Sequence, residues 1–369
     1  MSKTFFIVSL SLLVFVQVSF SQQKNITADK TIKIGLLIPN NKSTEAKFGA
    51  EMAINEANLK HNKKGLSYQL IVRSLKGSWG TGSNKAVDLI FNDHVWTIMG
   101  AHDGRNAHLV EQVISKTHVV YLSSWATDPT LSQAFVPWYF SCVPNDNQQV
   151  KTLIEEIYKK RKLTKIALVS SKNFDANYTL KIFLKKAKAI GQTELMQFAY
   201  DDSSMNLNSL ITKINKTKIQ AIVLLDNPST SFNFIQELQS QKKGLPIFGA
   251  LALFGEHAFD EVKLAQYNNI TLVTSGNWLD SKNALFNNKF RQKYGKAPSA
   301  VAAYAYDGMN LLINAIKRSW PNRTKVKEEL SKINYNGVTG LIQFDDKGNR
   351  KEAAGLIEIE KGNPIIIKK

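Results

Sequence analysis

The sequence predicts an α/β protein of two lobes, in which parallel sheets are covered by helices on both faces. The first observation is that short β-branched runs alternate with longer segments of helical period from residue 32 onward. The second is that these runs form two series of similar size, with no Pro- or Gly-rich tether between them. The third is length, because about 348 residues beyond the predicted leader are too many for one ordinary core.

The predicted strands are short apolar runs that end in polar or glycine-containing loops. The first series comprises residues 32–39, 68–74, 95–100 and 119–124, and the second comprises 165–171, 194–200, 219–226, 245–250 and 270–276. A final stretch, "GLIEIEKGNPIIIKK", alternates apolar and polar residues around Gly362-Asn363-Pro364. This pattern predicts a C-terminal hairpin at a sheet edge.

The predicted helices lie between these strands. In residues 43–59, alanines recur at helical spacing after Ser43, which we expect to cap this helix. The segments "TLIEEIYKK" and "LITKINK" repeat the pattern in the second half, and a long helical stretch follows residue 280. We expect "VPNDNQQ", residues 143–149, to make the first crossing between the lobes.

The N-terminal residues predict export. Lys3 is followed by "FFIVSLSLLVFVQVSF", an apolar run that is short for a membrane span. Small residues at Ser19 and Ser21 suit cleavage before Gln22, and no cysteine near the cut suggests a lipid anchor. We therefore expect residues 1–21 to be a signal peptide and the mature chain to be periplasmic or secreted. An uncleaved anchor is the alternative.

The formal charge of +18 at pH 7 raises nucleic-acid binding as a function class. Export argues against that class. The lysines of "YKKRKLTK" and "FLKKAKAI" also share their helical segments with leucines and isoleucines that would fill the opposite face. We interpret these lysines as solvated helix faces and expect no nucleic-acid partner.

Aromatic and polar residues directly follow the predicted strands, where ligands collect in open parallel sheets. A cleft with an apolar body and a few orienting polar groups is what a small-molecule site needs. The candidate ligand-binding residues are Trp79, His102, Asp103, Gly104, Arg105, Trp125, Ala126, Thr127, Phe174, Asp226 and Asn227.

An enzymatic function has less support in the sequence. The chain lacks a G-x-S-x-G elbow, the spacing of a phosphate-binding loop and the glycine triplet of dinucleotide binding. A hydrolase using His102, Asp103 and Arg105 is the alternative, although we interpret Asp103 and Arg105 as a local ion pair that shapes the loop. Cys142 is the single cysteine, so no intrachain disulfide can form, and we interpret it as a small apolar filler.

Metal binding would depend on the histidines, four of which lie close together at positions 94, 102, 108 and 118. Their spacing does not bring two onto one helix face, as zinc sites require. We therefore expect structural or solvent-exposed roles for His94, His108 and His118, and neither a metal nor another cofactor.

The order of motifs resembles that of the periplasmic solute-binding proteins of the branched-chain amino acid type, the extracellular component of an ABC importer. The resemblance covers nearly all of residues 32–362 and is carried by "IKIGLLIP", "FGAEMAINEAN", "LIFNDHVWTIMG", "VVYLSSWATDPTL", "QKYGKAPSAVAAYAYDGMNLLINAI" and "GVTGLIQFDDKGNR". It implies the type I periplasmic-binding fold, two Rossmann-like lobes joined by a three-crossover hinge that bends to close on a solute. Lobe one would comprise residues 32–145 plus 277–343, and lobe two residues 146–276 plus 344–369.

The resemblance also implies a function and its partners. The protein would be a non-enzymatic monomer that captures a small amino-acid-like or aromatic or carboxylate solute and delivers it to an ABC permease in the inner membrane. The alternative is a ligand-sensing module for a membrane receptor.

The resemblance further assigns roles to particular residues. The segment that holds the solute's carboxylate is matched by Trp125-Ala126-Thr127, but its hydroxyl partner after the third strand falls at Asp103-Gly104. Phe174 matches the aromatic residue of the second lobe, placed before Asp175 where the family usually has Tyr-Gly. The acid that grips the ammonium is replaced by "ALA", residues 250–252, which argues against a free α-amino acid unless Asp226 substitutes. Arg105 is available for a solute that carries an acid.

Overall fold

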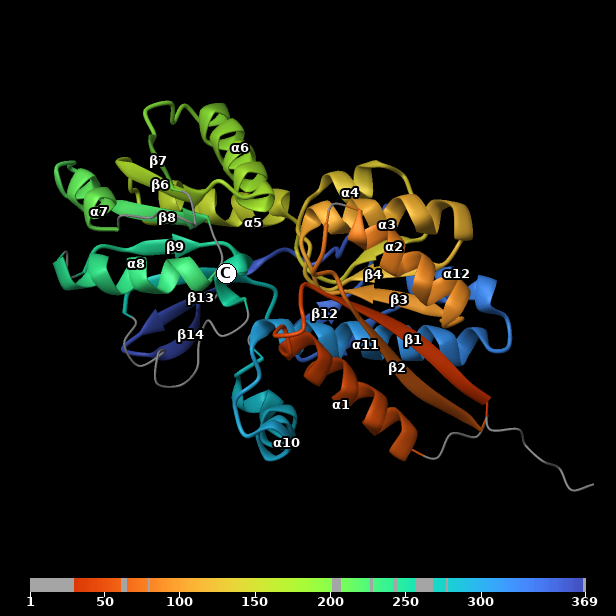
Figure 1. Ribbon diagram of the computed structural model, residues 1–369. Coiled ribbons are helices and arrows are strands. Elements are labelled where there is room, and N and C mark those ends of the chain that lie inside the picture. Colours follow the sequence, from red (N-terminus) through yellow and green to blue (C-terminus); the bar gives the residue numbers. More distant parts are fainter. Residues whose placement is uncertain are drawn as a thin grey trace, which may run out of the picture.

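The computed structural model describes residues 30–60, 65–78, 80–200, 207–225, 228–241, 244–255, 268–276 and 278–367. Within these ranges the predicted α/β fold class is confirmed, with two main sheets side by side and helices packed against each (Figure 1). No helix of the described part is long and apolar enough to cross a membrane. The predicted leader, residues 1–21, lies outside the described residues.

The first sheet is parallel in every strand pair that the structure describes. Its spatial order is β2-β1-β3-β4-β5. The strands are β1 (Lys30–Ile38), β2 (Leu66–Ser74), β3 (Thr97–Gly100), β4 (Val120–Ser123) and β5 (Tyr139–Ser141). The first four coincide with predicted runs. The sequence did not predict β5, because a strand this short leaves no periodic pattern.

The second sheet is mixed, and its described order is β14-β13-β10-β9-β8-β6-β7. Its strands are β6 (Ile166–Ser171), β7 (Met196–Tyr200), β8 (Ala221–Leu225), β9 (Ile247–Gly249), β10 (Ile270–Thr274), β13 (Gly355–Glu360) and β14 (Asn363–Ile367). The predicted C-terminal hairpin is confirmed as β13 and β14, which add antiparallel strands beyond β10. A separate small ribbon joins β11 (Tyr335–Gly337) to β12 (Gly340–Ile342).

The helices alternate with the strands. They are α1 (Glu45–Leu59), α2 (Thr81–Val87), α3 (Gly104–Thr117), α4 (Thr130–Gln133), α5 (Asp146–Ile154), α6 (Phe174–Ala189), α7 (Leu207–Asn215), α8 (Pro228–Gln241), α10 (Ala284–Tyr294), α11 (Ala300–Ser319) and α12 (Val326–Ser331). The predicted cap at Ser43 is wrong. Thr44 stands at the N-cap of α1, and its side chain makes no capping hydrogen bond.

Each sheet has an apolar core on both faces, because alternate strand residues point to opposite sides. Side chains of α1, α11 and α12 pack on one face of the first sheet, and those of α2 and α3 pack on the other. In the second sheet α7 and α8 cover one face, and α5 and α6 cover the other. We call each sheet with its helices the first and the second lobe.

The chain passes between the lobes three times in the described residues. The first passage leads from β5 of the first sheet to α5, which packs on the second. The second passage leads from β10 of the second sheet towards α11, which packs on the first. The third passage leads from β12 to β13 of the second sheet. "VPNDNQQ" connects β5 to α5 and thus lies at the first passage. The exact lobe boundaries stay a prediction.

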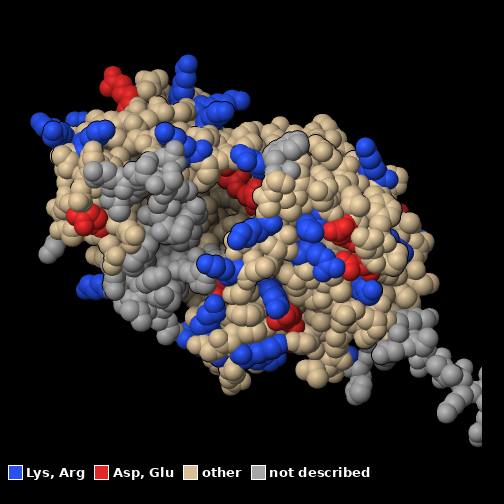
Figure 2. Space-filling view, in the orientation of Figure 1, with Lys and Arg blue, Asp and Glu red and all other residues tan. Residues whose placement is uncertain are grey.

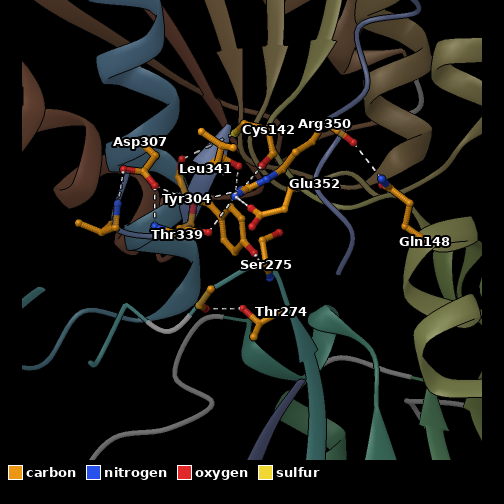
Figure 3. Close-up of polar contacts among 12 residues, drawn as sticks. Cys142, Gln148, Thr274, Ser275, Tyr304, Asp307, Thr339, Leu341, Arg350 and Glu352 are labelled. Carbon is orange, nitrogen blue, oxygen red and sulfur yellow. Dashed lines mark hydrogen bonds and ion pairs between the residues drawn. The ribbon is translucent and has the colours of Figure 1, made fainter. Parts of the chain in front are cut away.

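A buried arginine joins the first and third passages. The Arg350 side chain is 0% exposed and donates to the backbone carbonyls of Cys142 (2.9 Å), Thr339 (2.8 Å) and Leu341 (2.8 Å) (Figure 3). It also forms an ion pair with Glu352 at 3.0 Å. Five donors in a planar fork allow one guanidinium to reach all of these acceptors, which a lysine could not do.

Two side chains of α11, those of Asp307 and Tyr304, bind the segments before β12 and after β10. Asp307 accepts hydrogen bonds from the backbone N–H groups of Val338 (3.0 Å) and Thr339 (2.8 Å), so it fixes the chain before β12. Burial raises the pKa of Asp307 to about 6, although these hydrogen bonds and Arg350 oppose the shift. The Tyr304 hydroxyl accepts from the backbone N–H of Ser275, directly after β10 (Figure 3).

Cys142 lies in the same region and is fully buried. Its thiol contacts the carbonyl of Ser123, and burial raises the pKa of this thiol to about 12. The prediction that Cys142 is an apolar filler is therefore confirmed.

Substitution of Arg350 tests this network. Arg350→Met keeps most of the side-chain volume but leaves the carbonyls of Cys142, Thr339 and Leu341 without their donor, the first two of them buried, so we expect the free energy of unfolding to fall by about 3 kcal/mol. Arg350→Lys should recover only part of this loss, because it cannot donate in several fixed directions. The measurement is urea denaturation. The exposed Arg318→Met is the control, and equal effects of the two methionine variants would contradict the role of Arg350.

Candidate functional site

Loops from both lobes meet between the two sheets. The first lobe supplies the segment between β3 and α3 and the segment after β4, while the second lobe supplies the starts of α5 and α6. Figure 2 shows the surface hollowed between the lobes, with acidic side chains inside the hollow and lysines and arginines around it. The described candidate residues belong to these segments.

Asp103 shapes the first loop as the N-cap of α3. Its carboxylate accepts from the backbone N–H of Asn106 at 2.9 Å and from the Asn106 side chain at 2.8 Å. Burial alone would raise the pKa of Asp103, but His102 and the Asn106 bonds hold it below its usual value. The predicted ion pair with Arg105 is wrong, since no salt bridge joins these two described residues.

His102 lies behind the loop and is 1% exposed. Its Nε2 is 3.2 Å from the Tyr121 hydroxyl, and its Nδ1 is 3.0 Å from the Asp103 carbonyl oxygen. Burial lowers the pKa of His102 despite the neighbouring Asp103 carboxylate. Contact of this ring with a solute would require one of these two bonds to break, so its binding role stays a prediction.

Gly104 begins α3 and contacts the second lobe directly. Its backbone N–H is 3.1 Å from Oδ1 and 3.3 Å from Oδ2 of Asp175, which belongs to α6. A Cβ at position 104 would lie only 2.8 Å from that Oδ1 and 3.1 Å from Cβ of Asp128. A side chain here would therefore displace the Asp175 carboxylate.

The segment after β4 places Trp125 between the lobes. Trp125 is half-buried and packs against the core clusters of both lobes, with its ring centroid 6.5 Å from that of Tyr304. Ala126 is buried and donates its N–H to Ser123 Oγ at 3.0 Å. The Thr127 carbonyl accepts from the backbone N–H of Asp146 at 2.8 Å, across the first passage.

Phe174 opens α6 and is 38% exposed. Asn173 caps this helix by accepting from the backbone N–H of Ala176 at 2.8 Å, which fixes the direction in which Phe174 leaves the backbone. The Arg105 guanidinium carbon lies 5.6 Å from the Phe174 ring centroid, so these two residues form a cation–π contact between the lobes.

Several carboxylates gather where the lobes meet. Asp146 is buried and accepts from the Thr179 hydroxyl at 2.9 Å. Burial raises the pKa of Asp146 to about 8, and burial together with the Asp103 charge raises that of Asp175 to about 7. Asp128 is buried behind them. The region therefore disfavours additional negative charge.

His108 offsets part of this charge. It lies 3.0 Å from Asp128 through Nε2 and 3.3 Å from Glu111 through Nδ1. Hydrogen bonds to these two carboxylates raise the pKa of His108 to about 9. Its predicted structural role is confirmed, since both ring nitrogens contact side chains of the same lobe.

Three candidate residues, Trp79, Asp226 and Asn227, lie outside the described residues. Among the residues that are described, no group of three or more His, Cys, Asp and Glu side chains is placed to hold a metal ion.

Sequence reasoning missed Asp146 and gave Asp175 no role of its own. Both directly follow a passage or strand end and stand in the first turn of a helix. Asn145 precedes Asp146 by one residue, and Asn173 precedes Asp175 by two. An Asn in this place is typical of a helix N-cap, and acidic residues are common in the first turn that follows. That signal cannot show that the two acids face the same cleft.

Comparison with known proteins gives one family. The family model described as "Periplasmic binding protein" matches residues 31–362. The chain is also 24% identical over 364 residues to Glutamate receptor 3.4 of Arabidopsis thaliana, covering 84% of this chain and 36% of the receptor. It is 23% identical over 202 residues to the Leu/Ile/Val-binding protein BraC3 of Rhizobium johnstonii, covering 53% of this chain and 54% of that protein. The matches thus span about a third to a half of these curated relatives.

Solved structures share the fold at low identity. The substrate-binding protein LivJ of Streptococcus pneumoniae, in complex with isoleucine, is 20% identical with a TM-score of 0.79, covering 92% of this chain and 100% of that one. A solute-binding protein of R. palustris, in complex with benzoate, is 16% identical with a TM-score of 0.79, covering 91% of this chain and 95% of that one.

The His108 cluster predicts a pH dependence of stability. A histidine whose folded pKa of about 9 exceeds its unfolded value near 6.5 adds stability that is fully present below pH 6.5 and is lost as the pH rises through 9. His108→Asn should therefore lower the melting temperature at pH 6, and the difference from the wild type should shrink towards pH 10. The measurement is thermal denaturation across this range.

The exposed His94→Asn provides the matched control, because Asn tolerates the positive φ of 57° at that position. A His108→Asn effect that stays constant with pH would show that packing, and not charge, stabilises the cluster.

Proposed function

The chain belongs to the periplasmic binding protein family, and from this premise we propose that it captures a small organic solute between its lobes and delivers it to an ABC importer. The observation that carries the proposal is the meeting of the two lobes at the cleft. Gly104 and Arg105 of one lobe contact Asp175 and Phe174 of the other. A solute held between these loops would stabilise the closed arrangement, which is the form that a permease could distinguish from an empty one.

The cleft residues favour an amino-acid-like or aromatic solute. Trp125 and the partly exposed Phe174 supply aromatic surface. The Thr127 hydroxyl is hydrogen-bonded to the Asp146 carboxyl. The similar structures hold isoleucine, benzoate or 3,4-dihydroxybenzoic acid. In this chain Ala250 and Leu251 follow β9 and are buried, so this segment offers no carboxylate to an ammonium group.

The remaining expectations belong to the same proposal. We expect a monomer outside the cytoplasm, either periplasmic or secreted, that works with a permease in the inner membrane. We expect no catalysis, and the buried His102, with both ring nitrogens engaged, supports binding over hydrolysis. Turnover of a substrate by the purified protein, abolished in His102→Ala, would support the opposite.

Sensing is the second candidate function. The specific observation in its favour is the match to Arabidopsis glutamate receptors over most of this chain. In that case the lobes would close on a solute and present it to a membrane receptor. A permease and an ATPase encoded beside this chain would favour transport, whereas a neighbouring histidine kinase would favour sensing.

A thermal-shift screen of amino acids, aromatic acids, amides and short peptides tests solute capture. A true solute at 100 times its dissociation constant should stabilise the protein by about 2.7 kcal/mol. Trp125→Ala and Phe174→Ala should each reduce this shift, because they remove aromatic surface from the cleft.

Phe91→Ala is the matched control, since Phe91 is 58% exposed and precedes β3, away from the cleft loops. If both cleft variants kept the full shift, the cleft assignment would be wrong. If no compound of any class shifted the wild type, solute capture itself would lose its support.

A further inference from the structure

Asp175 makes one of the contacts between the lobes on which the proposed function rests. It belongs to α6 in the second lobe, yet its carboxylate accepts from the backbone N–H of Gly104, the first residue of α3 in the first lobe. The two residues are 71 positions apart in the sequence. The protein therefore joins its two lobes through its own carboxylate.

The place that Asp175 takes is one that suits a carboxylate. The first N–H groups of a helix have no partner within the helix, and the helix dipole favours negative charge there. Asp103 already satisfies the N–H of Asn106. The N–H of Gly104 is directed to Asp175, and the missing side chain at position 104 gives the carboxylate room to approach.

We propose that Asp175 is a specificity-determining clasp, which closes the cleft from the second lobe and excludes a solute's carboxylate from the N-terminus of α3. Both oxygens of Asp175 lie within 3.3 Å of the Gly104 nitrogen, so a second carboxylate has no place on this N–H while the clasp is closed. Arg105 and Phe174, the flanking residues, hold the same two helices together by their cation–π contact.

The charges around Asp175 also disfavour an anionic group at this end of the cleft. The charged and titratable groups around Asp175 are Asp103 and Arg105 at the start of α3, Asp128 after β4, Asp146 at the start of α5, and, behind them, His102 and His108. Asp103 and Asp128, whose pKa values are held below their usual range, repel a further anion, and Arg105 offsets them only in part. If the protein captures a solute as proposed above, that solute presents an uncharged or cationic group to this end of the cleft.

The closed arrangement of the lobes should be favoured at low pH. Burial raises the pKa of Asp175 in the closed form to about 7, above the ordinary value of 3.8 that an exposed Asp175 would have in an open form. The closed form therefore binds a proton more tightly, and the protonated acid still accepts from the Gly104 N–H through its carbonyl oxygen. Closure should be strongest below pH 4, weaken as the pH rises to 7, and change little above that.

The test measures the distance between the lobes without any solute, so it is independent of whether solute capture is correct. Spin labels are attached to cysteines introduced at the exposed positions Lys116 on α3 and Lys185 on α6. Cys142 stays unlabelled because it is fully buried. Pulsed electron paramagnetic resonance then gives the distance distribution at pH 5 and at pH 8.

Asp175→Ala should shift the distribution to longer distances at pH 5 and abolish its pH dependence. Gly104→Ala keeps the N–H but pushes the carboxylate away, so it should lengthen the distances as well, and the double variant should add nothing. Glu194→Ala, which removes one exposed negative charge from the same lobe, should match the wild type. Thermal denaturation checks that each variant is folded.

Distances in Asp175→Ala equal to those of the wild type at both pH values would overturn the clasp. Exclusion is tested separately by isothermal titration of the wild type with sodium benzoate, whose carboxylate is its polar group, and we expect no binding heat. Benzoate bound with its carboxylate on the Gly104 N–H in a crystal structure would overturn exclusion. Loss of solute capture with an intact Asp175→Ala effect would leave the clasp standing and refute only the proposed function.

Discussion

The structure depends on one buried charge at the three chain passages. Arg350 lies in the third passage and is fully buried, and its guanidinium joins the carbonyl of Cys142 in the first passage to those of Thr339 and Leu341 at β12. A buried cation is costly unless it is paired and fully hydrogen-bonded, so the surrounding backbone has little freedom to move around it. Asp307 and Tyr304 of α11 fix the remaining segments to the same point. These contacts therefore hold the segments of all three passages at one common centre.

The cleft depends on that centre. Helices α3 and α6 point their N-termini at each other because the two sheets lie side by side with their loops between them (Figure 1). Asp103 and Asn173 cap these helices and bring Gly104 beside Asp175 and Arg105 beside Phe174. The fold thus brings the N-termini of two helices together. Asp175, the residue after Phe174, occupies the α3 N-terminus and so excludes a solute's carboxylate from it.

Hydrophobic periodicity was sufficient to predict most of the fold, because buried parallel strands such as β1, β6 and β8 are continuous apolar runs. It failed where the signal was short or local, as for β5 and for the cap of α1. Strand ends also located His102, Asp103, Trp125 and Phe174, but spacing could not show that His102 is turned into the core. The contact between Gly104 and Asp175 is a tertiary event between residues 71 positions apart, which no local pattern encodes.

The distribution of charge in this chain affects the association rate and the affinity of a cationic solute in opposite directions. The protein as a whole carries a formal charge of +18, whereas the carboxylates of Asp103 and Asp128, whose pKa values are lowered, lie where the lobes meet. Long-range forces therefore slow the approach of a cationic solute, and short-range forces hold it once it has arrived. Ionic strength screens the first effect much more than the second, because buried charges are poorly screened. A cationic solute would thus enter faster in a salty medium, while a neutral one would be indifferent to salt.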